Sequence, residues 1–169
     1  MLMRGTRAMG MSAQFLRRCW RLMALAMALQ VVLLLAPASA WGLEAQRWLL
    51  QDQAGHTWSL TLLEQADPAY PAGLRLRLTD QSGTQRLNHR QRLRLRDALG
   101  GAWELDNRSH ELVPAGETLL PAASAQFDLS SLEPRPRAEL PLALDVPLAG
   151  GDSARLVAGA AVVAALHGA

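Results

Sequence analysis

The feature of this sequence that most constrains its fold is a nine-residue pattern, D-x-x-G-x-x-W-x-L, that occurs twice. The first copy contains Asp52, Gly55, Trp58 and Leu60. The second copy contains Asp97, Gly100, Trp103 and Leu105. Aspartate at the first position and glycine at the fourth are typical of a type I turn followed by a residue with positive φ, which is a common three-residue loop of β-hairpins. The repeat therefore predicts two hairpins with the same kind of turn.

The length of such a loop sets which residues of the two strands face each other. The predicted pairs of the first hairpin are Trp48–Leu60 and Leu50–Trp58. The predicted pairs of the second hairpin are Leu93–Leu105, Leu95–Trp103, Arg92–Asp106 and Arg94–Glu104. Each hairpin then has one apolar face and one more polar face. A register shifted by one residue would set Arg94 against Trp103, so we reject it.

The rest of the sequence after residue 40 has short segments of alternating apolar and polar residues, separated by turn residues. This pattern favours antiparallel strands. The expected strands are 46–52, 56–64, 74–80, 84–89, 91–97, 102–106, 125–132, 138–148 and 154–158. The prolines of 138–148 mark it as an edge strand, and a short helix follows residue 158. We therefore predict a single all-β domain over 41–169, with its core at 42–158. It is an antiparallel β-sandwich or a small barrel built from hairpins.

Residues 1–40 are predicted to be a secretory signal peptide. They contain five arginines and no acid, and an apolar run of 15 residues extends from Leu22 to Ala36. The small residues Ala38 and Ala40 fit a cleavage site before Trp41. The alternative is an uncleaved anchor, although a membrane span needs about 20 residues. Met11 is an alternative start, because the signal is complete without the first ten residues.

The arginines of the mature chain are the candidate binding residues. This part of the chain holds 12 arginines, no lysine and 15 acids, so its charge argues against a nucleic-acid partner. Arginines alternate with leucines on two expected strands, at Arg75, Arg77, Arg92, Arg94 and Arg96. The forked guanidinium suits phosphate or sulfate, so these side chains form an anion-binding face if the two strands are neighbours. The alternative is the plain solvated face of strands whose leucines point to the core.

The sequence contains no recognisable catalytic or metal-binding motif. None of the four histidines lies three to five residues from another: His56, His89, His110 and His167. There is no G-x-S-x-G motif, and the only cysteine, Cys19, precedes the apolar run. We therefore expect no catalytic residue, no metal and no cofactor. Tryptophans on strands could stack on sugars, but the predicted register places them with the leucines in the core.

Three features together resemble a family of small exported cyanobacterial proteins of unknown function. They are the signal peptide, the first hairpin with "LQDQAGHTW" at 50–58, and "FDLSSLEPRPRAELPLALDVPLAGGDSARL" at 127–156. The alanine-rich C-terminal tail departs from the more polar and aromatic ending expected of that family. The resemblance implies an exported compartment, the periplasm or the thylakoid lumen, and brings no catalytic residue to this chain.

Three functional hypotheses follow from these observations. The first is an exported non-catalytic binding or assembly module, whose partner is an envelope or thylakoid protein. The second is a carrier that holds a small ligand or an anion in a barrel mouth or on the arginine-rich strand face. The third is a hydrolase in which an acid and a histidine converge in a cleft. The apolar tail is too short to span a membrane, so no transmembrane span is expected in the mature chain.

Overall fold

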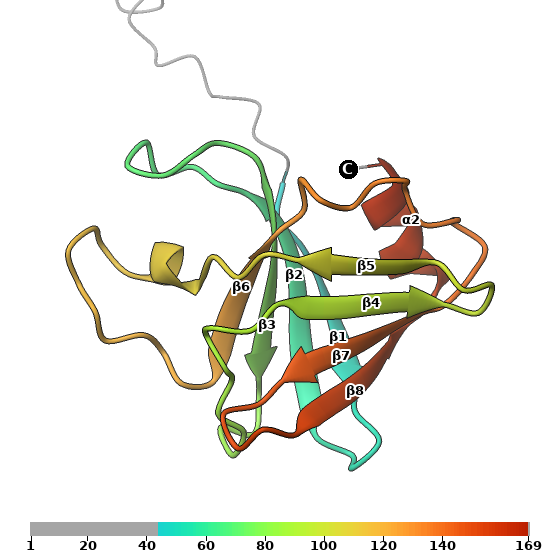
Figure 1. Ribbon diagram of the computed structural model, residues 1–169, viewed down its shortest axis with the longest axis horizontal. Coiled ribbons are helices and arrows are strands. Elements are labelled where there is room, and N and C mark those ends of the chain that lie inside the picture. The colour runs from blue at the N-terminus through green and yellow to red at the C-terminus, as the bar shows by residue number, and fades with distance from the viewer. Residues whose placement is uncertain (1–43, 169) are drawn as a thin grey trace, which may run out of the picture. The chain divides into compact units, whose positions relative to one another are not determined.

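In the computed structural model, which describes residues 44–168, eight β-strands form two antiparallel sheets of four strands each (Figure 1). The first sheet contains, in spatial order, β1 (Gln46–Gln51), β2 (Thr57–Glu64), β3 (Leu74–Asp80) and β6 (Ser124–Asp128). The second sheet contains, in spatial order, β5 (Ala102–Leu105), β4 (Leu93–Asp97), β7 (Leu142–Pro147) and β8 (Ser153–Ala158). A 3-10 helix, η1 (Ser109–Leu112), follows β5, and the helix α2 (Ala160–Gly168) follows β8. The predicted all-β class and the short C-terminal helix are confirmed.

Both predicted hairpins have the predicted register. The observed pairs are Trp48–Leu60 and Leu50–Trp58 in β1–β2, and Leu93–Leu105, Arg94–Glu104 and Leu95–Trp103 in β4–β5. The turn glycines Gly55 and Gly100 have φ angles of +86° and +91°, which glycine adopts without the steric cost of a Cβ atom. The repeated pattern therefore encodes the same turn twice, once in each sheet.

Isolated bridges link the two sheets at both sides. Asp52, just after β1, pairs with Leu156 of β8. Asn107, just after β5, pairs with Phe127 of β6. Each link joins an edge of one sheet to an edge of the other. The result is intermediate between the sandwich and the small barrel that the sequence predicts.

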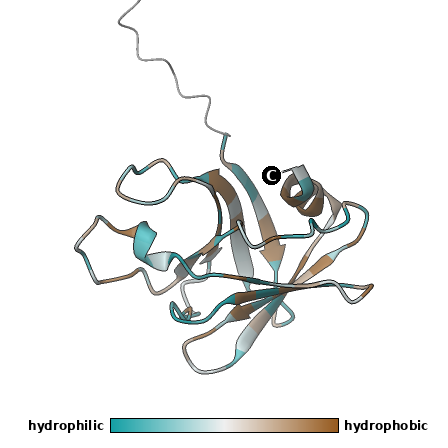
Figure 2. Ribbon diagram, turned by 45° about the horizontal axis from the view of Figure 1, so that its top comes forward, coloured by the Kyte–Doolittle hydropathy of each residue, from teal (hydrophilic) through white to brown (hydrophobic). Residues whose placement is uncertain are grey.

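The core lies between the two sheets and is built mainly from leucine. Its largest fully buried apolar side chains are Trp58, Phe127, Leu60, Leu62, Leu76, Leu78, Leu93, Leu95, Leu105, Leu132 and Leu142. Apolar and polar residues alternate along the strands in Figure 2, because each strand turns only one side to this core. Helix α2 adds Val162, Val163 and Leu166 to the same core. Burying one such side chain stabilises the fold by about 1.5–3 kcal/mol.

Two predicted elements differ in the structure. Strand β7 is not at an edge, because it lies between β4 and β8. Pro141 precedes this strand and Pro147 is its last residue. Neither proline therefore removes a backbone N–H from the middle of the strand, where the sheet needs it as a hydrogen-bond donor. Residues 84–89 do not form a strand, and only Leu87 makes an isolated bridge, to Leu148. A buried aspartate, Asp80, instead organises the turn before this segment by accepting the backbone N–H of Gln85 at 2.8 Å.

The predicted signal peptide, with its cleavage site at Ala38 and Ala40, lies outside the described residues. Within residues 44–168, no helix has both the length and the apolar character that crossing a membrane requires.

Candidate functional site

The structure separates the five predicted arginines into two groups. Arg75 and Arg77 lie on β3, whose neighbours are β2 and β6. Arg94 and Arg96 lie on β4, with Arg92 directly before it, and the neighbours of β4 are β5 and β7. A single face would have required β3 and β4 to be adjacent, and they belong to different sheets. Each group is therefore a separate candidate site.

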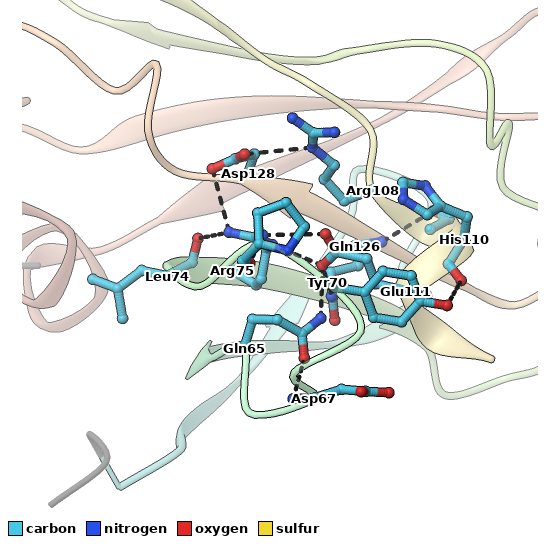
Figure 3. A network of polar contacts seen from close by, with 12 residues as sticks. Gln65, Asp67, Tyr70, Leu74, Arg75, Arg108, His110, Glu111, Gln126 and Asp128 are labelled. Carbon is cyan, nitrogen blue, oxygen red and sulfur yellow. Dashed lines mark hydrogen bonds and ion pairs between the residues drawn. The ribbon is translucent and has the colours of Figure 1, made fainter. Parts of the chain in front are cut away.

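Arg75 is buried, and each of its N–H donors has an acceptor (Figure 3). Its Nε and Nη2 donate to the two carboxylate oxygens of Glu111 at 2.8 and 3.1 Å. Its Nη2 also donates to the carbonyl of Pro71 at 2.8 Å. Its Nη1 donates to the carbonyl of Leu74 at 3.2 Å and to Oδ1 of Asp128 at 3.4 Å. A guanidinium has five N–H donors, so Arg75 has none left for a ligand.

Glu111 joins three distant segments of the chain in the same network (Figure 3). Its Oε2 accepts hydrogen bonds from the side-chain amides of Gln65 at 2.8 Å and Gln126 at 2.9 Å. Oε1 of Gln126 in turn accepts from Nε and Nη2 of the half-buried Arg77, at 3.1 and 2.8 Å. The network fastens the 65–73 loop and η1 to the side of the first sheet that faces away from the core. We therefore assign it a structural role and leave Arg75 and Arg77 out of the candidate binding surface.

The carboxylates of this network are held in their charged form. Burial alone would raise the pKa of Glu111, but hydrogen bonds from Arg75 and the two glutamine amides outweigh it and hold the pKa below its ordinary value of 4.5. Burial would likewise raise the pKa of Asp128, but hydrogen bonds from Ser130 and the charge of Arg75 hold it below 3.8. In the unfolded chain both groups regain their ordinary pKa, so the unfolded state binds protons first as the pH falls.

We expect this protein to lose stability in acid. The stabilisation from Glu111 is complete above its ordinary pKa of 4.5 and decreases as the pH falls through its lower folded pKa. Urea unfolding should therefore show a midpoint that is constant near pH 6–7 and falls between about pH 4.5 and pH 3. A Glu111→Gln variant should be less stable at neutral pH and less dependent on acid, whereas Glu104→Gln should keep the acid dependence. Equal midpoints of the natural protein at about pH 6 and pH 3.5 would contradict this account.

A row of alternating charge crosses the outer side of the second sheet. The register places four charged residues side by side on β5, β4, β7 and β8: Glu104, Arg94, Asp145 and Arg155. Arg92 and Arg96 stand before and after Arg94 on the same side, because side chains two positions apart share a face. We call the four arginines of this surface, Arg92, Arg94, Arg96 and Arg155, the arginine face.

Carboxylates orient the arginine face without covering it. The ion pairs are Arg92–Asp106 at 2.8 Å, Arg92–Glu104 at 3.6 Å, Arg94–Glu104 at 3.1 Å, Arg155–Asp145 at 3.0 Å and Arg96–Asp145. The arginine side chains are 48–70% exposed, whereas Asp145 is only 13% exposed. The carboxylates of Glu104 and Asp145 contact Nε of Arg94 and Arg155, and the Nη groups of these two arginines have no partner in the described part of the chain. The Nη groups of Arg94 and Arg155 are therefore open donors on this face.

Two hollows lie along the arginine face. The first, of about 470 Å³, is lined by Arg92, Arg94 and Arg155 and by the acids Glu104, Asp145 and Asp152. The second, of about 440 Å³, has the apolar side chains of Ala98, Pro141, Ala143 and Val157 beside Arg96 and Arg155. Both volumes are within the range of small-molecule pockets, about 300–1,000 Å³. Both hollows lie on the outer side of the second sheet, away from the leucine core.

One histidine and one acid meet in the way that the hydrolase hypothesis requires. His56 Nδ1 lies 3.0 Å from Asp52 Oδ2, and both residues line a third hollow of about 300 Å³. The other ring nitrogen, Nε2, contacts the side-chain nitrogen of Gln85 at 3.4 Å and no hydroxyl or thiol. Within residues 44–168, the pair therefore has no nucleophile in contact with the histidine. No group of three or more histidines, cysteines or acids within residues 44–168 is arranged to hold a metal ion.

Sequence reasoning identified only part of the arginine face. Arg155 and Asp145 were not recognised, because they join Arg94 through the β4–β7 and β7–β8 pairings, and β4 and β7 are distant in the sequence. A signal is nevertheless present. Asp145 and Arg155 each stand between buried apolar residues on their strands, so their parity alone places both on an outer side.

The fold and this surface define a class of protein: an all-β domain with a leucine core and a charged, arginine-bearing outer face. The chain belongs to the family described as protein of unknown function (DUF3122), whose model matches residues 43–165. No curated protein and no solved structure shows significant similarity to it.

Proposed function

We propose that this protein is an exported, non-catalytic binding module that holds an anionic group of its partner on the arginine face. One observation carries the proposal: Glu104 and Asp145 fix Arg94 and Arg155 through Nε and leave their Nη groups open. Exposed ion pairs of this kind contribute only about 0–1 kcal/mol to folding, so the fold itself has little need of this row. The row is better explained as a set of oriented donors.

The chemistry of these donors selects the class of ligand. The Nη groups of a guanidinium match the spacing of two oxygens in a carboxylate, phosphate or sulfate group. The neighbouring hollow at Ala143 and Val157 offers an apolar surface for the part of the partner next to its anionic group. These features together suit an acidic segment of another exported protein.

The location of the protein is proposed from its N-terminal sequence. The arginines, apolar run and small residues of 1–40 are typical of a secretory signal. The resemblance to small exported cyanobacterial proteins narrows the compartment to the periplasm or the thylakoid lumen, so we propose an envelope or thylakoid protein as the partner.

We expect a double Arg94→Gln, Arg96→Gln variant to bind anions more weakly while remaining folded. Glu104 keeps Arg92 and Asp145 keeps Arg155 as a partner, so neither carboxylate is left without a cation. Losing charge-assisted hydrogen bonds should weaken binding by about tenfold or more. A titration of the mature protein with sulfate, followed by NMR of the arginine Nε–Hε signals, measures the affinity and the residues involved.

The matched control removes the same charge elsewhere. Arg47→Gln with Arg137→Gln changes two exposed arginines that lie outside the arginine face. This variant should bind sulfate as the natural protein does. Equal affinity of the natural protein and the Arg94, Arg96 double variant would overturn the proposal.

A further inference from the structure

The turn between β1 and β2 holds a histidine in a fixed orientation. The oxygen that contacts His56 Nδ1, Oδ2 of Asp52, also accepts a hydrogen bond from Nε1 of Trp58 at 3.1 Å. The side chain of Asp52 is 5% exposed and that of His56 is 32% exposed. Burial alone would raise the pKa of Asp52, but the bonds from Trp58 and His56 outweigh it and hold the pKa below 3.8. A charged carboxylate thus positions Nδ1, and Nε2 remains for other contacts.

The second copy of the repeat shows that the turn does not need this histidine. Oδ1 of Asp97 accepts the backbone N–H groups of Leu99 and Gly101, as Oδ1 of Asp52 accepts those of the corresponding residues in the first copy. Gly101 occupies the position of His56, and a Cβ atom there would lie 2.7 Å from Asp97 Oδ2 and from the Trp103 ring. The same turn therefore forms around a glycine, and the histidine contact is an addition to it.

The hollow of about 300 Å³ lies beside this histidine, between the turn and the start of β8. Figure 1 shows the β1–β2 turn next to β8, where the Asp52–Leu156 bridge joins them. The charged residues that line the hollow with His56 are Asp52 from the end of β1 and Arg155 from β8. The 3.4 Å contact of Nε2 with Gln85 is long for a hydrogen bond, so the ring nitrogen has capacity for a better partner.

We propose that this hollow is a binding subsite for an oxyanion, in which Arg155 supplies a permanent positive charge and His56 donates a hydrogen bond from Nε2. The ligand class is a carboxylate, phosphate or sulfate group. The inference rests on the proposed function, because Arg155 also belongs to the arginine face. It goes further by adding a second anchor, next to the β1–β2 turn, and a dependence on pH.

The direction of the pH dependence follows from the two states of the ring. Protonated His56 donates to Asp52 from Nδ1 and to the anion from Nε2. Neutral His56 keeps its proton on Nδ1 for Asp52, so Nε2 presents a lone pair that repels an anionic oxygen. Asp52 stays charged in this range because its pKa is held below 3.8, whereas histidine is the side chain that ordinarily titrates between about pH 5 and pH 8. Binding should therefore strengthen as the pH falls.

The experiment is a sulfate titration of the mature protein at about pH 8 and pH 5.5, followed by NMR of the histidine ring and arginine Nε–Hε signals. Sulfate is the probe because its own charge is constant over this range. We expect the affinity to rise about tenfold at the lower pH, as for one charge-assisted hydrogen bond, and the His56 ring signals to shift on binding. Both pH values lie above the range in which the carboxylates destabilise the fold.

Two variants separate this subsite from a general effect of histidine charge. His56→Gln keeps a neutral donor for Asp52 and should bind sulfate with an affinity that no longer depends on pH. His110→Gln changes an exposed histidine of η1, outside the hollow, and should keep the pH dependence.

The outcomes distinguish the subsite from the arginine face. Shifts at Arg94 and Arg96 without a shift at His56 would overturn the subsite and leave the proposed function standing. Another outcome is that sulfate shifts the His56 ring signals, more strongly at the lower pH, and leaves the signals of Arg94 and Arg96 unchanged. That result would support the subsite as an independent site and overturn the proposed function. Unmoved signals at all of these residues would overturn both.

Discussion

Replacing Glu111 by alanine is expected to destabilise the domain by about 3–5 kcal/mol, because the change leaves the buried guanidinium of Arg75 without its bidentate partner. The side chains of Arg75 and Glu111 are 1% and 0% exposed, so water cannot replace the lost oxygens. Asp128 at 3.4 Å and two backbone carbonyls would remain as acceptors. The amides of Gln65 and Gln126 would lose an acceptor as well. Urea unfolding at neutral pH measures the difference in free energy.

An exposed pair from the same chain provides the control. Glu104→Ala removes the ion pairs with Arg92 and Arg94, whose side chains are 59% and 70% exposed. This change should cost at most about 1 kcal/mol. If Glu111→Ala fails to fold, the double variant Arg75→Met, Glu111→Leu should recover part of the loss, because it removes both charges together. Equal effects of the Glu111 and Glu104 substitutions would refute the structural role of the buried network.

The contrast between these two pairs shows what could be read from the sequence and what could not. Both hairpin registers were predicted because turn chemistry and side-chain parity are local, and Arg94 was correctly paired with Glu104. The same parity treats Arg75 like Arg94, since both alternate with leucines on a strand. The difference is that η1 and the 65–73 loop pack over Arg75 and bury it. No local sequence pattern predicts this packing.

The sequence patterns that could predict pairing between distant strands were weaker. The prolines of β7 predict an edge strand only if they lie inside it, and the structure places Pro141 just before the strand and Pro147 at its end. The pairing of β4 with β7 brings Asp145 beside Arg94 and so completes the row on the second sheet. For the Asp52 turn, its type was predictable. The hydrogen bond that Asp52 accepts from His56 was not predictable, because it depends on the side-chain rotamer of the histidine.

Trp58→Ala is expected to cost about 3–5 kcal/mol, near the upper end of that range. Trp58 is fully buried on β2, between β1 and β3, so its removal leaves a cavity that neighbouring leucines fill only in part. The change also takes the Nε1 donor from Asp52, a carboxylate that is almost buried. Since a domain of this size is stable by only about 5–15 kcal/mol, the variant should retain a small part of its stability, as measured by urea unfolding.

Two further variants divide the effect of Trp58 into packing and hydrogen bonding. Trp58→Phe keeps most of the ring volume and loses the bond to Asp52, so it should cost about 1.5–3 kcal/mol. Trp48→Ala changes a partly exposed tryptophan on the neighbouring strand β1 and should cost clearly less than Trp58→Ala. A Trp58→Phe variant as stable as the natural protein would show that the Asp52 carboxylate does not depend on the indole. The position of His56 would then have to be explained by Asp52 and the turn backbone alone.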